Sequence, residues 1–165
     1  FVTRDPKFSV LSLDVQKPGA WQERIVALSR MIDASTPDFT RFKARGGKLI
    51  LVQGHDDPSV SPHANARYYQ SIVDKMGKSE ADAFSRFYAI PGLAHGDGKF
   101  LIGWDALATI DAWADAATPP AALIAIDTNK ATFGRSRPMC VYPGWQKYKG
   151  TGSLDDAASY ACTTQ

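Results

Sequence analysis

An aspartate and a histidine each follow a short apolar run of the kind that forms a buried strand. Residues 49–52 are apolar and precede Asp57, and residues 84–90, which end before a Pro-Gly pair, precede His95. Such runs, bounded by turn residues, are typical of strands that a parallel sheet buries on both faces. Ligands and catalytic groups collect at the carboxyl ends of the strands in open α/β sheets. We therefore expect Asp57 and His95 to meet at that edge of a sheet.

An aspartate and a histidine placed in this way could form part of a Ser-His-Asp triad. In such a triad the imidazole takes the proton of the serine hydroxyl, and the carboxylate holds the imidazole in the correct tautomer and stabilises its charged form. α/β-Hydrolases present the triad in the chain order Ser, Asp or Glu, His, and Asp57 precedes His95 as that order requires. The pair therefore predicts acyl transfer chemistry of the hydrolase type.

The nucleophile of this triad is missing from the sequence. No G-x-S-x-G string occurs, and the nearest match, residues 134–138, ends in proline and follows His95 instead of preceding Asp57. We therefore expect the serine outside these residues, either on an N-terminal segment of the same hydrolase or on a separate chain. On this hypothesis the sequence is the C-terminal portion of an α/β-hydrolase fold, incomplete without that segment and inert alone.

The same residues also allow two alternatives to a triad. An aspartate before Pro58 commonly accepts backbone hydrogen bonds in a solvated turn, and a histidine after Pro-Gly is commonly an ordinary loop residue. A divalent metal site is a rival chemistry, although no HExxH motif supports it. Its candidate ligands are His55, Asp56, Asp57, His63, His95 and Asp97.

The flanking sequence predicts the elements that position this pair. Apolar residues at helical spacing predict helices over residues 21–34, 62–76 and 101–117, and a last short strand is expected over residues 122–126. From residue 135 onward, Pro and Gly favour an ordered loop held by aromatic packing. The inward face predicted for the third helix comprises Trp104, Leu107, Ile110, Trp113 and Ala114.

These elements suggest three parts: residues 1–37 as an arm and helix, residues 38–134 as the hydrolase core, and residues 135–165 as a C-terminal loop segment. The 165 residues carry a net charge of +2 with scattered Lys and Arg, so we expect no nucleic-acid partner. No apolar run approaches the roughly 20 residues that span a bilayer, so we expect no membrane partner.

Both cysteines, Cys140 and Cys162, lie in the last part of the chain. The segment between them is rich in Gly and Pro and poor in core residues, which is where a disulfide that closes a loop stabilises most. This favours a disulfide over two unrelated buried thiols. The spacing does not suggest zinc, because no Cys or His lies close enough to complete a set of four ligands.

Several linked motifs resemble the C-terminal part of the tannase and feruloyl esterase family. In chain order they read FxARGGKLILxxGxxDP, SPxxxxxYYxxxxxxMG, PGxxH, RxRPxCxYPxxxxYKGxG and DDAxxxxC. The resemblance covers residues 38–162. These proteins are α/β-hydrolases with a large inserted lid, secreted or periplasmic, which cleave esters of phenolic acids, and mono(hydroxyethyl) terephthalate hydrolases are among them.

The resemblance implies roles for individual residues. It makes Asp57 the triad acid, His95 the triad base, and Cys140 with Cys162 the C-terminal disulfide of the family. Val60, just beyond the acid, is a candidate contact for a small aromatic ester substrate, or else a turn residue. No cofactor is expected within these residues, and a calcium ion would belong to the absent lid.

The sequence departs from the family pattern directly after the histidine. Family members typically carry a cysteine there, bridged to a cysteine before the nucleophilic serine, whereas this chain has Gly96. Either the chain belongs to a branch without that tether, or the site is altered. The second hypothesis is therefore a non-catalytic structural or interaction subunit that retains the hydrolase fold.

Overall fold

The computed structural model describes residues 1–120 and 123–164, which form two compact units, Phe1–Thr36 and Pro37–Gln165. The first unit contains two short 3-10 helices, η1 (Val10–Ser12) and η2 (Gly19–Trp21), followed by the helix α1 (Gln22–Ile32). The Arg24 guanidinium donates hydrogen bonds to the carbonyl oxygen of Phe1, which ties the N-terminal arm to α1. The predicted helix over residues 21–34 is therefore present, with slightly shorter bounds.

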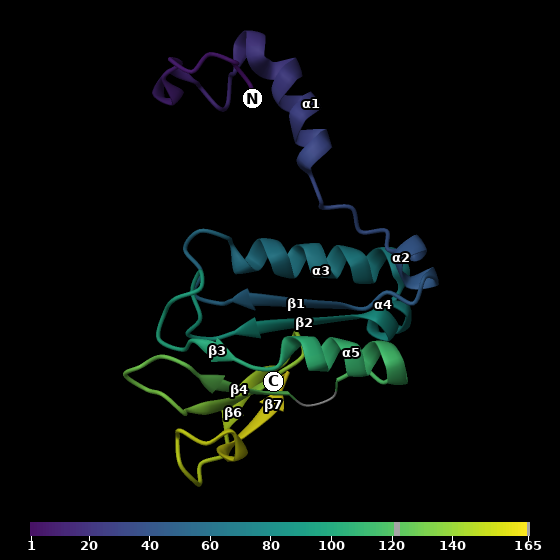
Figure 1. Ribbon diagram of the computed structural model, residues 1–165, viewed down its shortest axis with the longest axis vertical. Coiled ribbons are helices and arrows are strands. Elements are labelled where there is room, and N and C mark those ends of the chain that lie inside the picture. The colour runs from purple at the N-terminus through teal and green to yellow at the C-terminus, as the bar shows by residue number, and fades with distance from the viewer. Residues whose placement is uncertain (121–122, 165) are drawn as a thin grey trace. The chain divides into compact units, whose positions relative to one another are not determined.

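The second unit is built on two parallel strands, β1 (Leu49–Gly54) and β2 (Ser85–Ile90), which pair from Leu49 with Ser85 to Gly54 with Ile90. The helix α3 (Pro62–Met76) connects them across one side, and Figure 1 shows α3 and α5 (Ala106–Ala116) on opposite sides of the strand pair. This arrangement confirms the predicted strand-helix-strand unit and its mixed α/β class.

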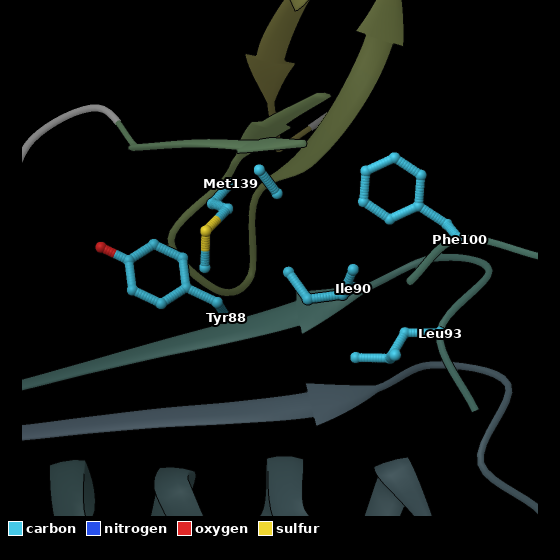
Figure 2. Packing of buried hydrophobic residues seen from close by; sticks show 6 residues of the cluster. Tyr88, Ile90, Leu93, Phe100 and Met139 are labelled. Carbon is cyan, nitrogen blue, oxygen red and sulfur yellow. The ribbon is translucent and has the colours of Figure 1, made fainter. Parts of the chain in front are cut away.

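Alternate residues of the strands face two separate hydrophobic clusters. Leu49 packs against the cluster of α3, which includes the fully buried Ile72 and Phe84, while Ile50 packs against the cluster on the other face. Figure 2 shows that second cluster, in which Tyr88 and Ile90 of β2 point toward Met139. The strand β2 is buried on both faces, as predicted, whereas β1 is less buried, with Val52 38% exposed.

The residues that start and stop α3 lie at the ends of the helix itself. The Ser61 hydroxyl caps its N-terminus by accepting from the Ala64 N–H, Pro62 occupies the first turn, and Gly77, at φ +87°, ends it. None of the helices in the described residues is long and apolar enough to cross a membrane.

The third predicted helix is wrong at its start. Residues 102–103 form the strand β3 (Ile102–Gly103), which pairs with β4 (Leu123–Asp127), and Asp105 then caps α5 by accepting from the Ala108 N–H. Of the predicted inward face, Trp113 is buried as expected, whereas Leu107 is 77% exposed and Ala114 is also exposed. The predicted strand over residues 122–126 is β4; its first residue, Ala122, lies outside the described residues.

Two further differences concern elements that the sequence did not indicate. The short helix α4 (Lys78–Phe84) follows α3 and takes Phe84 out of the predicted strand. The short helix α2 (Thr40–Ala44), by contrast, is the helical turn that Asp38 is suited to cap, and the Asp38 carboxylate accepts from the Thr40 N–H. The C-terminal part, predicted as ordered loop, contains three short strands that pair through their backbones, with turns and loops between them. The strands are β5 (Ser136–Met139), β6 (Trp145–Tyr148) and β7 (Tyr160–Thr163), with a short 3-10 helix η3 (Ala157–Ser159).

The C-terminal strands are held by backbone pairing, by aromatic packing and by a disulfide. The strand β5 pairs with β4, and β6 pairs with β7. The Tyr142 ring packs on Phe87 of β2 with ring centroids 5.1 Å apart, so the predicted aromatic packing is present at this position. The disulfide between Cys140 and Cys162 confirms the predicted bridge.

Candidate active site

The parallel pairing of β1 and β2 brings Asp57 and His95 together. Gly54 and Ile90 are opposite each other at the strand ends, and Asp57 and His95 follow these ends on separate loops. The Oδ2 atom of Asp57 lies 2.9 Å from Nδ1 of His95. This is the contact by which a triad carboxylate holds an imidazole, and it leaves Nε2 as the nitrogen that can exchange a proton with a reacting group.

The Asp57 carboxylate is held on both oxygens. Its Oδ1 accepts from the backbone N–H groups of Ser59 and Val60, each at 2.8 Å, and its Oδ2 accepts from Nε2 of Gln53 at 3.2 Å. The side chain is only 5% exposed. The Val60 N–H and the His95 imidazole, with smaller effects from Ser59 and Gln53, hold the pKa of Asp57 well below its ordinary value. The carboxylate is therefore ionised at neutral pH.

The imidazole of His95 is the open member of the pair. Its side chain is 60% exposed. The hydrogen bond with Asp57, followed by the charge of Asp57 and that of Asp97, raises the pKa of His95 above its ordinary value. The pair thus combines a fixed negative charge with an imidazole whose pKa is raised.

The loop that carries His95 packs directly against the end of β1. The backbone N–H of Asp56 donates to the carbonyl oxygen of Leu93 at 3.1 Å. A Cβ atom on Gly54 would lie 2.4 Å from the carbonyl oxygens of both Leu93 and Ala94, so only glycine fits there. Gly96, the position of the family departure, has φ +89°, a conformation that favours glycine.

The remaining sequence candidates have other surroundings. In the described part of the chain, no three His, Cys, Asp or Glu side chains gather in a group that could hold a metal ion, so the six ligand candidates form no such site there. His55 and His63 line a small cavity of about 230 Å³ together with Phe87 and Tyr142. Val60 is 40% exposed, and its backbone N–H donates to the Asp57 carboxylate.

A larger cavity, of about 840 Å³, lies elsewhere among the described residues. It is lined by residues of β4, β5 and the C-terminal segment, including Ile124, Pro138 and Cys162, and by neither Asp57 nor His95. We therefore place the candidate active site at the strand ends and not in this cavity.

Sequence reasoning missed two polar residues beneath the acid. Gln53 is 6% exposed, and Nδ2 of Asn65, on α3, donates to its Oε1. The available signal was a lone polar side chain at the end of the apolar run LILVQG.

Comparison with known proteins places this site in a family. The protein-family model described as tannase and feruloyl esterase matches residues 1–163 of this chain. The chain belongs to the tannase and feruloyl esterase family. Over 163 residues it is 48% identical to an uncharacterized esterase of Agrobacterium fabrum, a match that covers 98% of this chain and 30% of that protein. The match to mono(2-hydroxyethyl) terephthalate hydrolase of Piscinibacter sakaiensis is 33% identical over 133 residues and covers 78% of this chain and 22% of that protein.

The fold is also that of the family. The crystal structure of feruloyl esterase B from Aspergillus oryzae superposes with a TM-score of 0.80 at 24% identity, covering 98% of this chain and 35% of that one. The chain thus spans about a third or less of the length of these tannase and feruloyl esterase relatives.

Proposed function

We propose that this chain is the C-terminal part of a serine carboxylesterase that cleaves esters of phenolic acids, of the feruloyl or galloyl kind. Asp57 is the orienting carboxylate and His95 the general base and acid. The observation that carries the proposal is the 2.9 Å contact between Asp57 Oδ2 and His95 Nδ1. Family membership supports the reaction class.

The nucleophilic serine belongs to a segment outside these residues, N-terminal in the same hydrolase or on a partner chain. The 60% exposed side chain of His95 leaves room for that segment to approach. Because the oxyanion hole of such hydrolases uses the residue after the nucleophile, it is also supplied from there. The oxidised pair of Cys140 and Cys162 supports a secreted or periplasmic location.

The two residues then act in sequence. His95 Nε2 takes the serine proton as the serine oxygen bonds to the acyl carbon, and returns it to the departing alcohol. Water repeats the exchange, so that the carboxylic acid leaves and the serine is restored. Asp57 stays ionised throughout, because its hydrogen bonds hold its pKa low, and it stabilises the transient imidazolium.

The test uses the complete protein, with the polypeptide that carries the serine. Hydrolysis of methyl ferulate, methyl gallate and a short p-nitrophenyl ester is measured for the wild type, Asp57→Asn and His95→Ala. We expect kcat to fall by about 10⁴-fold in each variant, the loss typical of a disabled triad. Asp56→Asn and His63→Ala are matched controls, and circular dichroism checks folding.

The outcomes are distinct. Loss in the two site variants, with activity retained in the two controls, supports the triad and ranks the substrates. Unchanged rates in Asp57→Asn and His95→Ala remove both residues from the chemistry. No activity in the wild type on any ester favours the non-catalytic subunit.

A further inference from the structure

A buried amide lies directly beneath the candidate acid. Gln53 is the one polar side chain in residues 49–54, and it is 6% exposed at the end of β1. Burying an amide costs free energy unless its donors and acceptor are paired. The partners of Gln53 therefore show what the residue does.

The amide of Gln53 connects helix α3 to Asp57. Its Nε2 lies 3.2 Å from Asp57 Oδ2, 3.0 Å from the carbonyl oxygen of Gly54 and 3.2 Å from that of Val60. Its Oε1 accepts from Nδ2 of Asn65. Because Asn65 supplies a donor to Oε1, it fixes which end of the Gln53 amide faces the carboxylate.

The oxygen that Gln53 contacts is the one that contacts His95. Asp57 Oδ1 is occupied by the backbone N–H groups of Ser59 and Val60, while Oδ2 accepts from both Gln53 and His95. The carboxylate can rotate only if these bonds break. Gln53 also holds the Val60 carbonyl, so it braces both the carboxylate and the turn that presents it.

We propose that Gln53, oriented by Asn65, is a positioning residue of the esterase site, which fixes Asp57 Oδ2 toward His95 and sets how strongly the carboxylate attracts the imidazole proton. The proposal rests on the proposed function, because it assigns Gln53 an effect on the same acid–base pair.

The chemical consequence has a definite sign. A donor on Oδ2 withdraws charge from the carboxylate, so its removal makes Asp57 more basic and stabilises the protonated form of His95. The base of the reaction then becomes available only at higher pH. The charged groups around His95 are Asp57 from the neighbouring loop and Asp97 on its own loop. Gln53 and Asn65 do not titrate.

The experiment measures kcat/KM against pH for a short p-nitrophenyl ester, using the complete protein and Gln53→Met, which keeps the side-chain length and removes the amide. We expect a roughly tenfold loss, in line with a hydrogen bond to a charged group. We also expect the midpoint of the acid limb to rise by about 0.5 pH unit. Gln70→Met is the matched control, because Gln70 is an exposed residue of α3 whose side-chain amide donates to Asp74 and does not contact the candidate site.

The shift of the midpoint separates positioning from a structural role. A variant that merely folds poorly contains less active enzyme, and its acid limb keeps the wild-type midpoint. Asn65→Ala, which leaves Gln53 in place, is the second variant, with a smaller loss and a shift in the same direction. Wild-type midpoints in Asn65→Ala and in any folded Gln53→Met overturn the proposal.

A double-mutant cycle with Asp57→Asn tests whether Gln53 acts through the acid. We expect Gln53→Met to have little further effect once Asp57 is replaced, since a shared path makes the two losses non-additive. Fully additive losses overturn the proposal. Full activity in Asp57→Asn alone would instead overturn the proposed function, so the two failures are distinguishable.

Discussion

At the scale of single residues, the two titratable groups of the site have pKa values that are shifted in opposite directions. The hydrogen bonds from Val60, His95, Ser59 and Gln53 lower the pKa of Asp57, and the bond to Asp57 raises the pKa of His95. The carboxylate consequently keeps its charge across the whole neutral range, while the imidazole holds its proton to a higher pH than an ordinary histidine. Such divergence is what an acid–base pair needs, because one member orients and the other transfers protons.

This divergence predicts the pH dependence of ester hydrolysis. On the proposed function His95 acts as a base only when neutral, so activity should rise with pH through its pKa. Because that pKa is raised, the acid limb of kcat/KM should have its midpoint above about 6.5, the ordinary value for an imidazole. A rate profile from pH 5 to 9 in the complete protein measures it, and a midpoint below 6 would contradict the raised pKa.

The contact between Gly54 and the histidine loop predicts a sensitive substitution. In Gly54→Ala the new methyl group would lie 2.4 Å from two carbonyl oxygens, so the end of β1 and the loop of His95 must move apart. We expect a loss of about 1 to 3 kcal/mol in the free energy of unfolding, as for overpacked sites, and at least about tenfold in kcat/KM. Urea unfolding and ester hydrolysis measure the two effects, and wild-type values in both would refute the close contact.

At the scale of elements, a buried carboxylate anchors the segment that follows the histidine loop. Asp127, at the end of β4, is fully buried and accepts from the Leu101 N–H, from Thr132 and from the Arg135 guanidinium. Burial by itself would raise the pKa of Asp127, but these hydrogen bonds and that from the Asn129 N–H outweigh it and lower the pKa. The β3–β4 pair is therefore fixed by charge as well as by backbone pairing.

Replacing Arg135 by Met should destabilise the protein, because the buried charge of Asp127 then has no cationic partner. We expect a loss of about 3 kcal/mol in the free energy of unfolding at pH 7, the lower end for a buried carboxylate that loses its partner, because the Arg135 side chain is partly exposed. The lowered pKa of Asp127 means that its stabilisation is present above the unfolded-state value, about 3.9, and is lost as the pH falls. The difference in the free energy of unfolding between the variant and the wild type should thus become smaller below about pH 4. Arg41→Met, at an exposed position of α2, is the control.

A buried hydroxyl on β2 predicts the opposite effect. The Tyr88 hydroxyl is buried in the core and has no hydrogen-bond partner within the described residues. Tyr88→Phe should therefore stabilise the protein by about 1 kcal/mol, the lower end of the cost of an unpaired polar group. The matched control is Tyr160→Phe, which removes a hydroxyl that donates to the Leu154 carbonyl at 2.8 Å and should destabilise. Thermal unfolding of both variants checks the contrast, and destabilisation by Tyr88→Phe would contradict it.

At the scale of the whole molecule, the C-terminal strands depend on one covalent link. Cys140 and Cys162 are 22 positions apart, and their bond closes a loop that carries β6 and much of the C-terminal turn structure. For a loop of this size the chain-entropy argument gives about 3 kcal/mol.

Replacing both cysteines by Ala should lower the free energy of unfolding of the complete protein by that amount. Denaturant unfolding measures it, and wild-type protein treated with a reductant should show the same loss. An unchanged midpoint in both samples would show that the strands hold without the bridge.

The sequence predicted the parts of this molecule that depend on local pattern. The β1–α3–β2 unit and the meeting of Asp57 with His95 followed from apolar runs and turn residues. The start of α5 did not, because pairing of Ile102 with the distant Asp127 decides it. The C-terminal strands were missed for the same reason, since their partners are separated by loops rich in Gly. Gln53 was passed over because its role depends on Asn65, a residue of a different element.

The acid, the base and every side chain that holds them come from one continuous stretch, residues 49–98. Because the stretch is continuous, it can be transferred to another protein as a single segment. On the proposed function, a chimera that joins it, with the strands that follow, to the N-terminal part of another family member would retain the proposed proton-transfer pair and take its serine from that other protein. Joining the two parts before β1 should then change which ester is accepted while Asp57 and His95 keep their contact.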